Sequence, residues 1–513
     1  MFRWKATAAV LVAATLALTA CSQPATEDGS STDSGAPTGT LTLVGSFSPS
    51  SLDAAAANWG NTAPFYQATY DTLLRMSNDG EVGPFLATDW SYDDTNTSLT
   101  LTLRDDVEFT DGSKLTSEVV KENLLRFQSG TSPAASSLAR VSSVETPDDV
   151  TVVINLSEPD PALLAYLTRD AGTVASGEAI ADDPAKLATD PIGSGPYVLD
   201  TATTVTGSSY VYTINEDYWN PELQHYAKIV INVVGDPTAA LNIIKSGEAN
   251  AVRLANNQDL AEIEGAGWSL TPNYLNVAGL LLFDRGGTMN PALGDVRVRQ
   301  AINYAFDREG MLNALQKGAG KIYEQTFGEG TAAYDESLNE TYGYDPEKAK
   351  KLMKDAGYAD GFTLDIPTTA SISPTQFNLI TQQLAEIGIT TRYTDLGNNF
   401  IAEVTAGKWA ADTQSLEQNG TWQLAQFMLA PEAIWNPFRY QDDQVDEYLE
   451  IMQYGTQEEQ DAAAKALNRY VTEEAWFAWW YRPQVNFATD ANTTVTPMST
   501  NSFPAIYDFV PKS

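Results

Sequence analysis

The chain has 513 residues, of which 43% are hydrophobic and 19% charged, and its formal net charge at pH 7 is −37. A surface this acidic repels nucleic acids and anionic membranes, which argues against both as partners and is most simply explained as a solubility feature. The length exceeds what one compact core usually holds, so we expect two or more lobes.

The first residues predict an export signal. Arg3 and Lys5 precede an apolar run over residues 6–20, and small residues lead to Cys21. The run is shorter than the ~20 residues that a membrane-spanning helix needs, and the pattern is typical of a removable signal peptide. Residues 18–21 resemble the lipobox of bacterial lipoproteins, in which the cysteine is lipidated. An ordinary secretory peptide with an incidental cysteine is the alternative.

We therefore expect residues 1–20 to be removed and lipid on Cys21 to anchor the protein to the outer face of the cell membrane. Cys21 is the only cysteine, so it cannot form an internal disulfide. Residues 21–39 are mostly Ser, Thr, Gly, Pro and acidic residues, with too little apolar surface to offset the entropy of ordering. This segment is predicted to be a disordered tether.

Strands and helices alternate along the rest of the chain. Period-two or apolar patterns predict strands at residues 40–44, 99–103, 151–156, 209–214, 362–366 and 387–393. Helical spacing and caps predict helices at residues 115–127, 298–306, 346–356 and 374–386, and a Thr456/Glu459 capping box begins a last long helix. The order in the second half is typical of an α/β lobe.

Catalytic and metal-binding patterns are absent. The only histidine is His225, and the chain lacks a Gly-x-Ser-x-Gly elbow, a zinc-type Cys/His spacing and a phosphate-binding loop. Residues 318–321 and 93–96 are interpreted as turns, because the first lacks the hydroxyl of a phosphate loop and the second lacks the Gly and Glu of a calcium loop. We therefore predict no enzyme activity, no cofactor and no metal site.

Four stretches carry a resemblance to a known family. They are residues 70–116 (with Tyr70-Asp71-Thr72-Leu73-Leu74 and a Thr-Asp-Gly turn at 110–112), 191–197 (Pro-Ile-Gly-Ser-Gly-Pro-Tyr), 295–309 and 344–358. Together they resemble the family 5 extracellular solute-binding proteins, the peptide-, dipeptide- and nickel-binding receptors of bacterial ABC importers. The resemblance extends from about Thr40 to the C-terminus.

The resemblance implies an α/β fold of the periplasmic-binding-protein type. This is the two-lobed class II form, of the large family 5 kind, with an extra N-terminal subdomain and a hinge between the lobes. We expect lobe I at residues 40–278, with an inserted subdomain at about 65–190, lobe II at residues 279–485, and a return to lobe I at residues 486–513. The ligand is expected between the lobes, where hinge closure encloses it.

The resemblance also indicates ligand-binding residues. In the family's peptide binders an acid that follows a tryptophan in the second lobe pairs with the α-ammonium group, and Trp409 and Asp412 occupy that place. Asn58 and Trp59 follow the first strand, in a region that family ligands touch, and Trp422 lies in another. The chain departs from the peptide-binder pattern over residues 413–420. Trp476, Trp479 and Trp480 are expected in the core instead.

The leading hypothesis is an extracytoplasmic, monomeric peptide receptor that delivers its ligand to ABC permease and ATPase subunits. One alternative keeps the fold and changes the ligand to an oligosaccharide or another polar organic solute, because tryptophans are frequent and residues 413–420 differ. Nickel is disfavoured, since imidazole ligands are nearly absent. More distant alternatives are a hydrolase that uses carboxylates alone and a surface sensor or adhesin that binds without transport.

Overall fold

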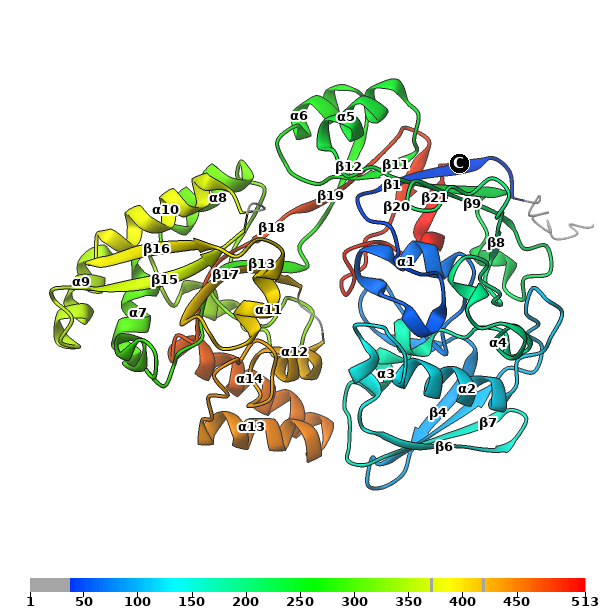
Figure 1. Ribbon diagram of the computed structural model, residues 1–513, viewed down its shortest axis with the longest axis horizontal. Coiled ribbons are helices and arrows are strands. Elements are labelled where there is room, and N and C mark those ends of the chain that lie inside the picture. Colours follow the sequence, from blue (N-terminus) through cyan, green and yellow to red (C-terminus); the bar gives the residue numbers. More distant parts are fainter. Residues whose placement is uncertain (1–36, 370–371, 418–419, 513) are drawn as a thin grey trace, which may run out of the picture. The chain divides into compact units, whose positions relative to one another are not determined.

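The computed structural model describes residues 37–369, 372–417 and 420–512. Cys21, the predicted signal peptide and most of the predicted tether therefore lie outside the described residues. The described chain is mixed α/β and forms six sheets (Figure 1). Within these residues, none of the helices is long and apolar enough to span a membrane.

The largest sheet has seven strands and gathers segments from both ends of the chain. Its order is β12 (Ser269–Asn273), β19 (Val485–Thr489), β11 (Ala251–Arg253), β1 (Thr40–Gly45), β10 (Lys228–Val233), β9 (Ser209–Ile214) and β8 (Tyr197–Leu199). β1 is parallel to its neighbours β10 and β11, whereas β19 is antiparallel to β11 and β12. The predicted strands at residues 40–44 and 209–214 are confirmed.

Alternation along β1 explains why this sheet is covered on both faces. Leu41 and Leu43 point into one core cluster, which includes Phe65 of α1 (Trp59–Gln67). Val44 points into the other, which includes residues of α5 (Pro237–Ser246) and α6 (Leu260–Gly265). Successive side chains of a strand face opposite sides, so both sides of this strand are buried against helices.

A second, four-stranded sheet lies in the predicted inserted subdomain. Its order is β4 (Ala87–Tyr92), β5 (Ser98–Leu103), β7 (Thr151–Leu156) and β6 (Val141–Asp148), and the helices nearby are α2 (Ser117–Gln128), α3 (Leu163–Tyr166) and α4 (Gly177–Asp182). Leu99, Leu101 and Leu103 alternate into one cluster with residues of α2. Thr116 Oγ1 accepts a hydrogen bond from Val119 N and begins α2 as predicted.

Two glycines of the 191–197 stretch lie where two backbones cross. A Cβ atom at Gly193 would lie 2.1 Å from Thr69 O, and one at Gly195 would lie 2.5 Å from Thr69 C. The close approach lets Gly195 N donate to Thr69 O at 3.0 Å. The motif is therefore architectural, because no side chain fits at either position.

The second half of the chain is built on a sheet of order β14 (Gly320–Ile322), β18 (Phe477–Pro483), β13 (Asn276–Leu282) and β17 (Ala411–Glu417), with parallel β15 (Phe362–Thr368) and β16 (Ile389–Asp395) beside it (Figure 1). The helices on one face are α7 (Val296–Ala305), α8 (Arg308–Gln316), α9 (Pro346–Asp355) and α10 (Pro374–Ala385). Those on the other are α11 (Phe400–Thr405), α12 (Thr421–Met428), α13 (Asp443–Tyr454) and α14 (Gln457–Glu473).

Caps and burial in this half follow the sequence patterns. Asp345 Oδ1 accepts from Lys348 N at 2.9 Å and begins α9, and Thr456 with Glu459 forms the predicted capping box of α14. Trp476, Trp479 and Trp480 are each 1% exposed, which confirms their placement in the core. The smallest sheets are β2 (Leu74–Met76) with β3 (Val82–Pro84), and β20 (Thr493–Val495) with β21 (Phe509–Pro511).

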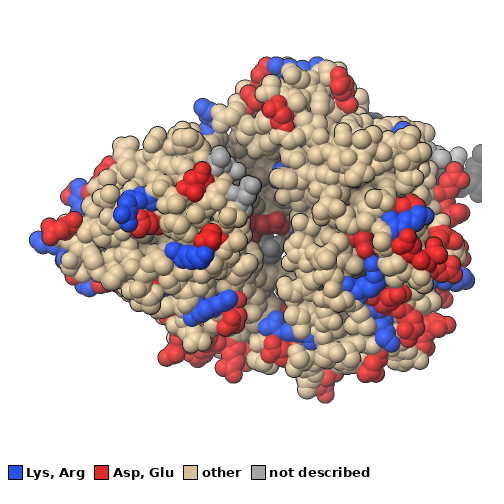
Figure 2. Space-filling view, viewed as in Figure 1, with Lys and Arg blue, Asp and Glu red and all other residues tan. Residues whose placement is uncertain are grey.

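The chain passes between the seven-stranded sheet and the β13 sheet twice, after β12 and again at Gln484 between β18 and β19. Both passages fall near the predicted lobe boundaries, but the exact bounds of the lobes stay a prediction. On the viewed face, acidic side chains are interspersed with lysines and arginines rather than gathered into one patch (Figure 2).

Candidate functional site

Asp412 is a fully buried carboxylic acid on the edge strand β17. It lies opposite Leu281 in the antiparallel register with β13, on the face that packs against α12 and α14. Gln414 Nε2 donates to Asp412 Oδ2 at 2.6 Å. The other oxygen, Oδ1, is buried and has no hydrogen-bond partner among the described residues. A buried acceptor without a donor is costly, so this oxygen is suited to an incoming donor.

Burial also changes the pKa of the Asp412 carboxyl group. Desolvation raises the pKa of Asp412 to about 7, and hydrogen bonds from the Gln414 amide and the Thr413 backbone lower it only in part. A cation placed at Oδ1 would favour the ionised form and lower the pKa again.

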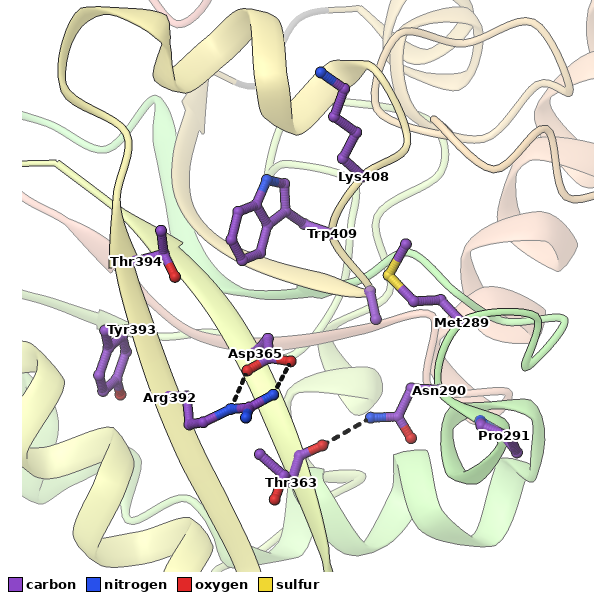
Figure 3. A pocket seen from close by; sticks show the side chains of 11 residues that line it. Met289, Asn290, Pro291, Thr363, Asp365, Arg392, Tyr393, Thr394, Lys408 and Trp409 are labelled. Atoms are coloured by element: carbon purple, nitrogen blue, oxygen red, sulfur yellow. Dashed lines mark hydrogen bonds and ion pairs between the residues drawn. The ribbon is translucent and has the colours of Figure 1, made fainter.

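Trp409 precedes β17 and lines a cavity of about 660 Å³ on the exposed face of β15 and β16. Figure 3 shows its indole ring facing this cavity, whose floor holds Asp365 and Arg392. These two side chains form a two-pronged ion pair, with N–O distances of 2.6 and 2.7 Å. Trp409 is half-buried, and its Nε1 is buried without a partner among the described residues.

Asn58 and Trp59 lie at the start of α1. Trp59 is 5% exposed, and its backbone N donates to Asp170 Oδ2 at 3.0 Å. Asn58 is exposed and occupies the N-cap position without a side-chain capping bond. Trp59 lines a small cavity together with Arg169 and Asn501. Both side-chain amide atoms of Asn501 are buried without a partner among the described residues.

Trp422 lies on α12 and is 6% exposed. It is a member of the core cluster between β17 and α14, and the Arg140 guanidinium lies 5.9 Å from its ring centroid. Trp422 is therefore close to the elements that carry Asp412 and Trp409, whereas Trp59 belongs to a separate cluster around α1, and Asn58 is the residue before it.

Arg169 lies near both groups of predicted site residues, the one with Trp59 and the one carried by β17 and α12. It lines the small cavity beside Trp59, and its Nη2 forms an ion pair at 3.8 Å with Oε1 of Glu417, the last residue of β17. Arg169 also lines a neighbouring cavity of about 310 Å³. That cavity is bounded by residues 76–82, 165–169 and 499–500 on one side and by residues 328–332, 420–423, 457–461 and 482 on the other.

Sequence reasoning missed Arg169, Arg482 and Asn501. The signal for Arg482 was available, because it follows directly on the apolar run of residues 475–481, and a charge at the end of such a run is rarely buried without a reason. Arg169 and Asn501 carried no comparable signal. Among the described residues, no group of three or more His, Cys, Asp or Glu is placed to hold a metal ion.

Comparison with known proteins identifies the family. The family model described as bacterial extracellular solute-binding proteins, family 5 middle, matches residues 81–442. The chain belongs to this family. The resemblance that the four sequence stretches indicated is thereby confirmed.

Curated relatives within the family bind different solutes. Heme-binding protein A of Haemophilus influenzae is 28% identical over 418 residues, which cover 74% of this chain and 75% of the relative. The glutathione-binding protein GsiB of Salmonella typhimurium is 26% identical over 428 residues, which cover 78% of this chain and 80% of the relative. These relatives therefore share the family but are named for different ligands.

Solved structures share the fold. DppA, an ABC transporter-associated periplasmic binding protein of Helicobacter pylori in complex with the peptide STSA, has a TM-score of 0.78 at 20% identity, covering 93% of this chain and 99% of that one. NikZ of Campylobacter jejuni in complex with Ni(L-His) has a TM-score of 0.72 at 18% identity, with 92% and 99% covered. The protein thus has the two-lobed α/β fold of family 5 binding proteins, as the sequence predicted.

Family 5 proteins are extracytoplasmic and deliver small-molecule ligands to an ABC permease and its ATPase. The relatives are named as binding proteins, and DppA is an ABC transporter-associated one. The protein is accordingly an extracytoplasmic ABC solute-binding protein.

Proposed function

We propose that this family 5 protein captures peptides and hands them to an ABC importer. The observation that supports this most is Asp412: a buried carboxyl group with one oxygen unpartnered among the described residues. The α-ammonium group of a peptide offers three donors and a positive charge, which match an acceptor of this kind. The peptide-bound DppA and the protein named glutathione-binding GsiB are in keeping with such a ligand.

The ligand site in this proposal comprises Asp412, Trp409, Trp59, Asn58 and Trp422. Asp412 binds the ammonium group, the tryptophan faces cover apolar parts of the ligand, and Asn58 supplies an exposed amide. The two lobes, at residues 40–278 with 486–513 and at residues 279–485, close on the ligand about the hinge. The protein acts as a monomer that needs no cofactor.

The N-terminus has a separate role in the proposal. Lipid on Cys21 holds the mature protein at the cell membrane, and residues 22–39 give it reach. Replacement of Cys21 by Ser should release the protein into the medium, as measured by fractionation and by the mass of the mature protein. An unlipidated wild-type mass would remove the anchor from the proposal.

A mixed library of two- to five-residue peptides, offered with free amino termini or N-acetylated, tests the ligand class. The wild type should retain free-amine peptides in mass spectrometry. Asp412→Asn should weaken the binding of a retained peptide by at least ~1.5 kcal/mol, since a charge-assisted bond is lost. The exposed control Asp94→Asn should bind as the wild type does.

An oligosaccharide or other polar solute is the second candidate, favoured by the indole face of Trp409 on its cavity and by the altered residues 413–420. Retention of a neutral glycan, together with equal retention of acetylated and free peptides, would replace the peptide proposal with this one.

A further inference from the structure

The cavity of about 660 Å³ beside Trp409, here called the Trp409 cavity, belongs to one half of the chain. Its lining residues are 289–291, 363, 365, 392–394 and 408–410. All of them fall between the two passages of the chain from one large sheet to the other, whereas the cavity beside Arg169 is lined from both halves. A ligand in the Trp409 cavity would therefore need no closure of two lobes around it.

The floor of the Trp409 cavity is a polar sheet face. Leu364 and Ile366 of β15 are buried in the core cluster that includes residues of α7 and α9. Successive side chains of a strand face opposite sides, so Thr363 and Asp365 face the cavity instead. On β16, Arg392 lies beside Asp365 in the parallel register. The floor thus presents hydroxyl, carboxylate and guanidinium groups.

The walls of the cavity are held in place by a buried acid. Asp284 is 0% exposed, and its Oδ2 accepts from Met289 N at 2.7 Å and from Asn290 N at 2.6 Å. Asn290 Nδ2 in turn donates to a backbone oxygen of β15 at 3.1 Å. Next to Trp409, Ala410 O accepts from Asp284 N at 3.1 Å. Both walls are thus tied to Asp284, as expected of a site that is formed before its ligand binds.

The charges around the cavity cancel. Arg392 Nε and Nη2 donate to the two oxygens of Asp365 at 2.6 and 2.7 Å, which leaves Arg392 Nη1 to donate to a ligand. Lys408, the other charged residue that lines the cavity, is paired with Glu403 at 2.8 Å. A neutral polar ligand therefore suits this cavity better than an ammonium or a carboxylate group does.

Trp409 adds an apolar surface to these polar groups. Figure 3 shows its indole ring facing the cavity, opposite the Asp365–Arg392 pair. A sugar ring has an apolar face of C–H groups, which an aromatic ring can cover, and a rim of hydroxyls that both donate and accept hydrogen bonds. The guanidinium, the carboxylate and the hydroxyls of Thr363 and Thr394 provide partners for such a rim. The volume of about 660 Å³ is that of a small-molecule site.

We propose that the Trp409 cavity is a second ligand site, which binds a short neutral saccharide in addition to the solute bound between the lobes. The inference goes beyond the proposed peptide function and does not depend on it. The side chains of Arg392 and Asp365 are 68% and 48% exposed, so the site stays in contact with solvent. We therefore expect a dissociation constant of about 1 mM, too weak for the sugar to be retained through purification.

Saturation-transfer NMR titrations with maltose, cellobiose and diacetylchitobiose test the second site. At least one of these disaccharides should bind the wild type. Thr394→Tyr places a ring in the cavity from an exposed strand position, which tolerates tyrosine, and should abolish the binding. Thr102→Tyr is the same change at an exposed position of β5 and should leave the binding unchanged. Arg392→Gln should weaken it roughly fivefold, because a hydrogen-bond donor is lost.

The variants at positions 394 and 392 leave Trp409 and Asp412 in place. They should therefore retain the same peptides as the wild type and unfold at the same denaturant concentration, which separates loss of the sugar site from loss of the fold. Disaccharide binding that requires position 394 would support the second site even if the protein retained no peptide.

Three results would overturn the second site. They are a wild type that binds none of the disaccharides, binding that persists in Thr394→Tyr, and displacement of the sugar by a retained peptide, which would put the sugar between the lobes. Each of these results would leave the peptide function standing, because that function is measured separately by the retention of peptides.

Discussion

Replacement of Asp412 by Asn should stabilise the unliganded protein at neutral and alkaline pH. Asn is close in shape to a protonated Asp, and its oxygen can still accept from Gln414, which now bonds Asp412 Oδ2. At the Oδ1 position it presents N–H groups, much as the protonated acid presents O–H. The substitution therefore removes the cost of ionising a buried group and changes little else.

The size of the stabilisation by Asp412→Asn follows from the raised pKa of Asp412. The folded pKa of about 7 lies above the ordinary value of 3.8, and this difference corresponds to about 4 kcal/mol. Below pH 3.8 the acid is protonated in both the folded and the unfolded protein, so its full stability contribution is present. Between pH 3.8 and 7 the unfolded chain ionises first, and the stability is lost as the pH rises. Above pH 7 the loss is complete.

Urea unfolding of the wild type and Asp412→Asn at several pH values measures this effect. The two proteins should be about equally stable at pH 4, and the variant should be more stable by about 4 kcal/mol at pH 8. Asp94→Asn, on an exposed turn, should follow the wild type throughout. A stability difference that does not change with pH, or a wild type that is the more stable protein at pH 8, would refute the reasoning.

Three further predictions concern binding and folding. A peptide's ammonium group should bind Asp412 in its ionised form, and the peptide amine is itself about half deprotonated at pH 8. Calorimetry should therefore show an affinity roughly fortyfold weaker at pH 5 than at pH 8. An affinity independent of pH would count against the pairing. Asp71→Ala removes the acceptor of three hydrogen bonds, which Ser194, Tyr218 and Trp219 donate. The free energy of unfolding should therefore fall by about 2 kcal/mol in denaturant titrations. An unchanged unfolding midpoint would contradict this. Gly195→Ala should lower the free energy of unfolding by about 3 kcal/mol or more, because the new Cβ would clash with the backbone of Thr69. Gly207 has open space around it and a positive φ, so Gly207→Ala should lower the free energy of unfolding by only about 1 kcal/mol. Equal losses in the two variants would argue against the clash.

Local sequence patterns predicted those helices and strands whose formation depends on residues close together in the chain. The Asp345 cap with Pro346 behind it begins α9, and the Thr456/Glu459 box begins α14, because each capping bond closes within three residues. The alternating strand at residues 99–103 is likewise a single pleated face on a core.

Features that depend on residues far apart in the chain could not be predicted from local sequence patterns. The glycines at 193 and 195 were recognised as part of a family motif, but the reason for them is the backbone of Thr69, more than a hundred residues earlier in the chain. The assembly of the seven-stranded sheet from β1, β10 and β19 also depends on pairings that no periodicity encodes.

The candidate site was predicted only in outline. Asp412 was selected from its place after Trp409, but its complete burial and the lone Oδ1 follow from the packing of β17 against β13 and the helices. Arg482 carried a signal, its place at the end of an apolar run, but its contacts with Leu275 O and the Tyr323 ring depend on packing that the run does not encode.

The ligand that the protein carries when purified from its own host tests the central claim most directly. Native mass spectrometry of that protein, followed by fragmentation of the released ligand, should show a peptide with a free amino terminus. A neutral glycan, or a ligand without an amine, would contradict the account of Asp412 and the peptide function built on it.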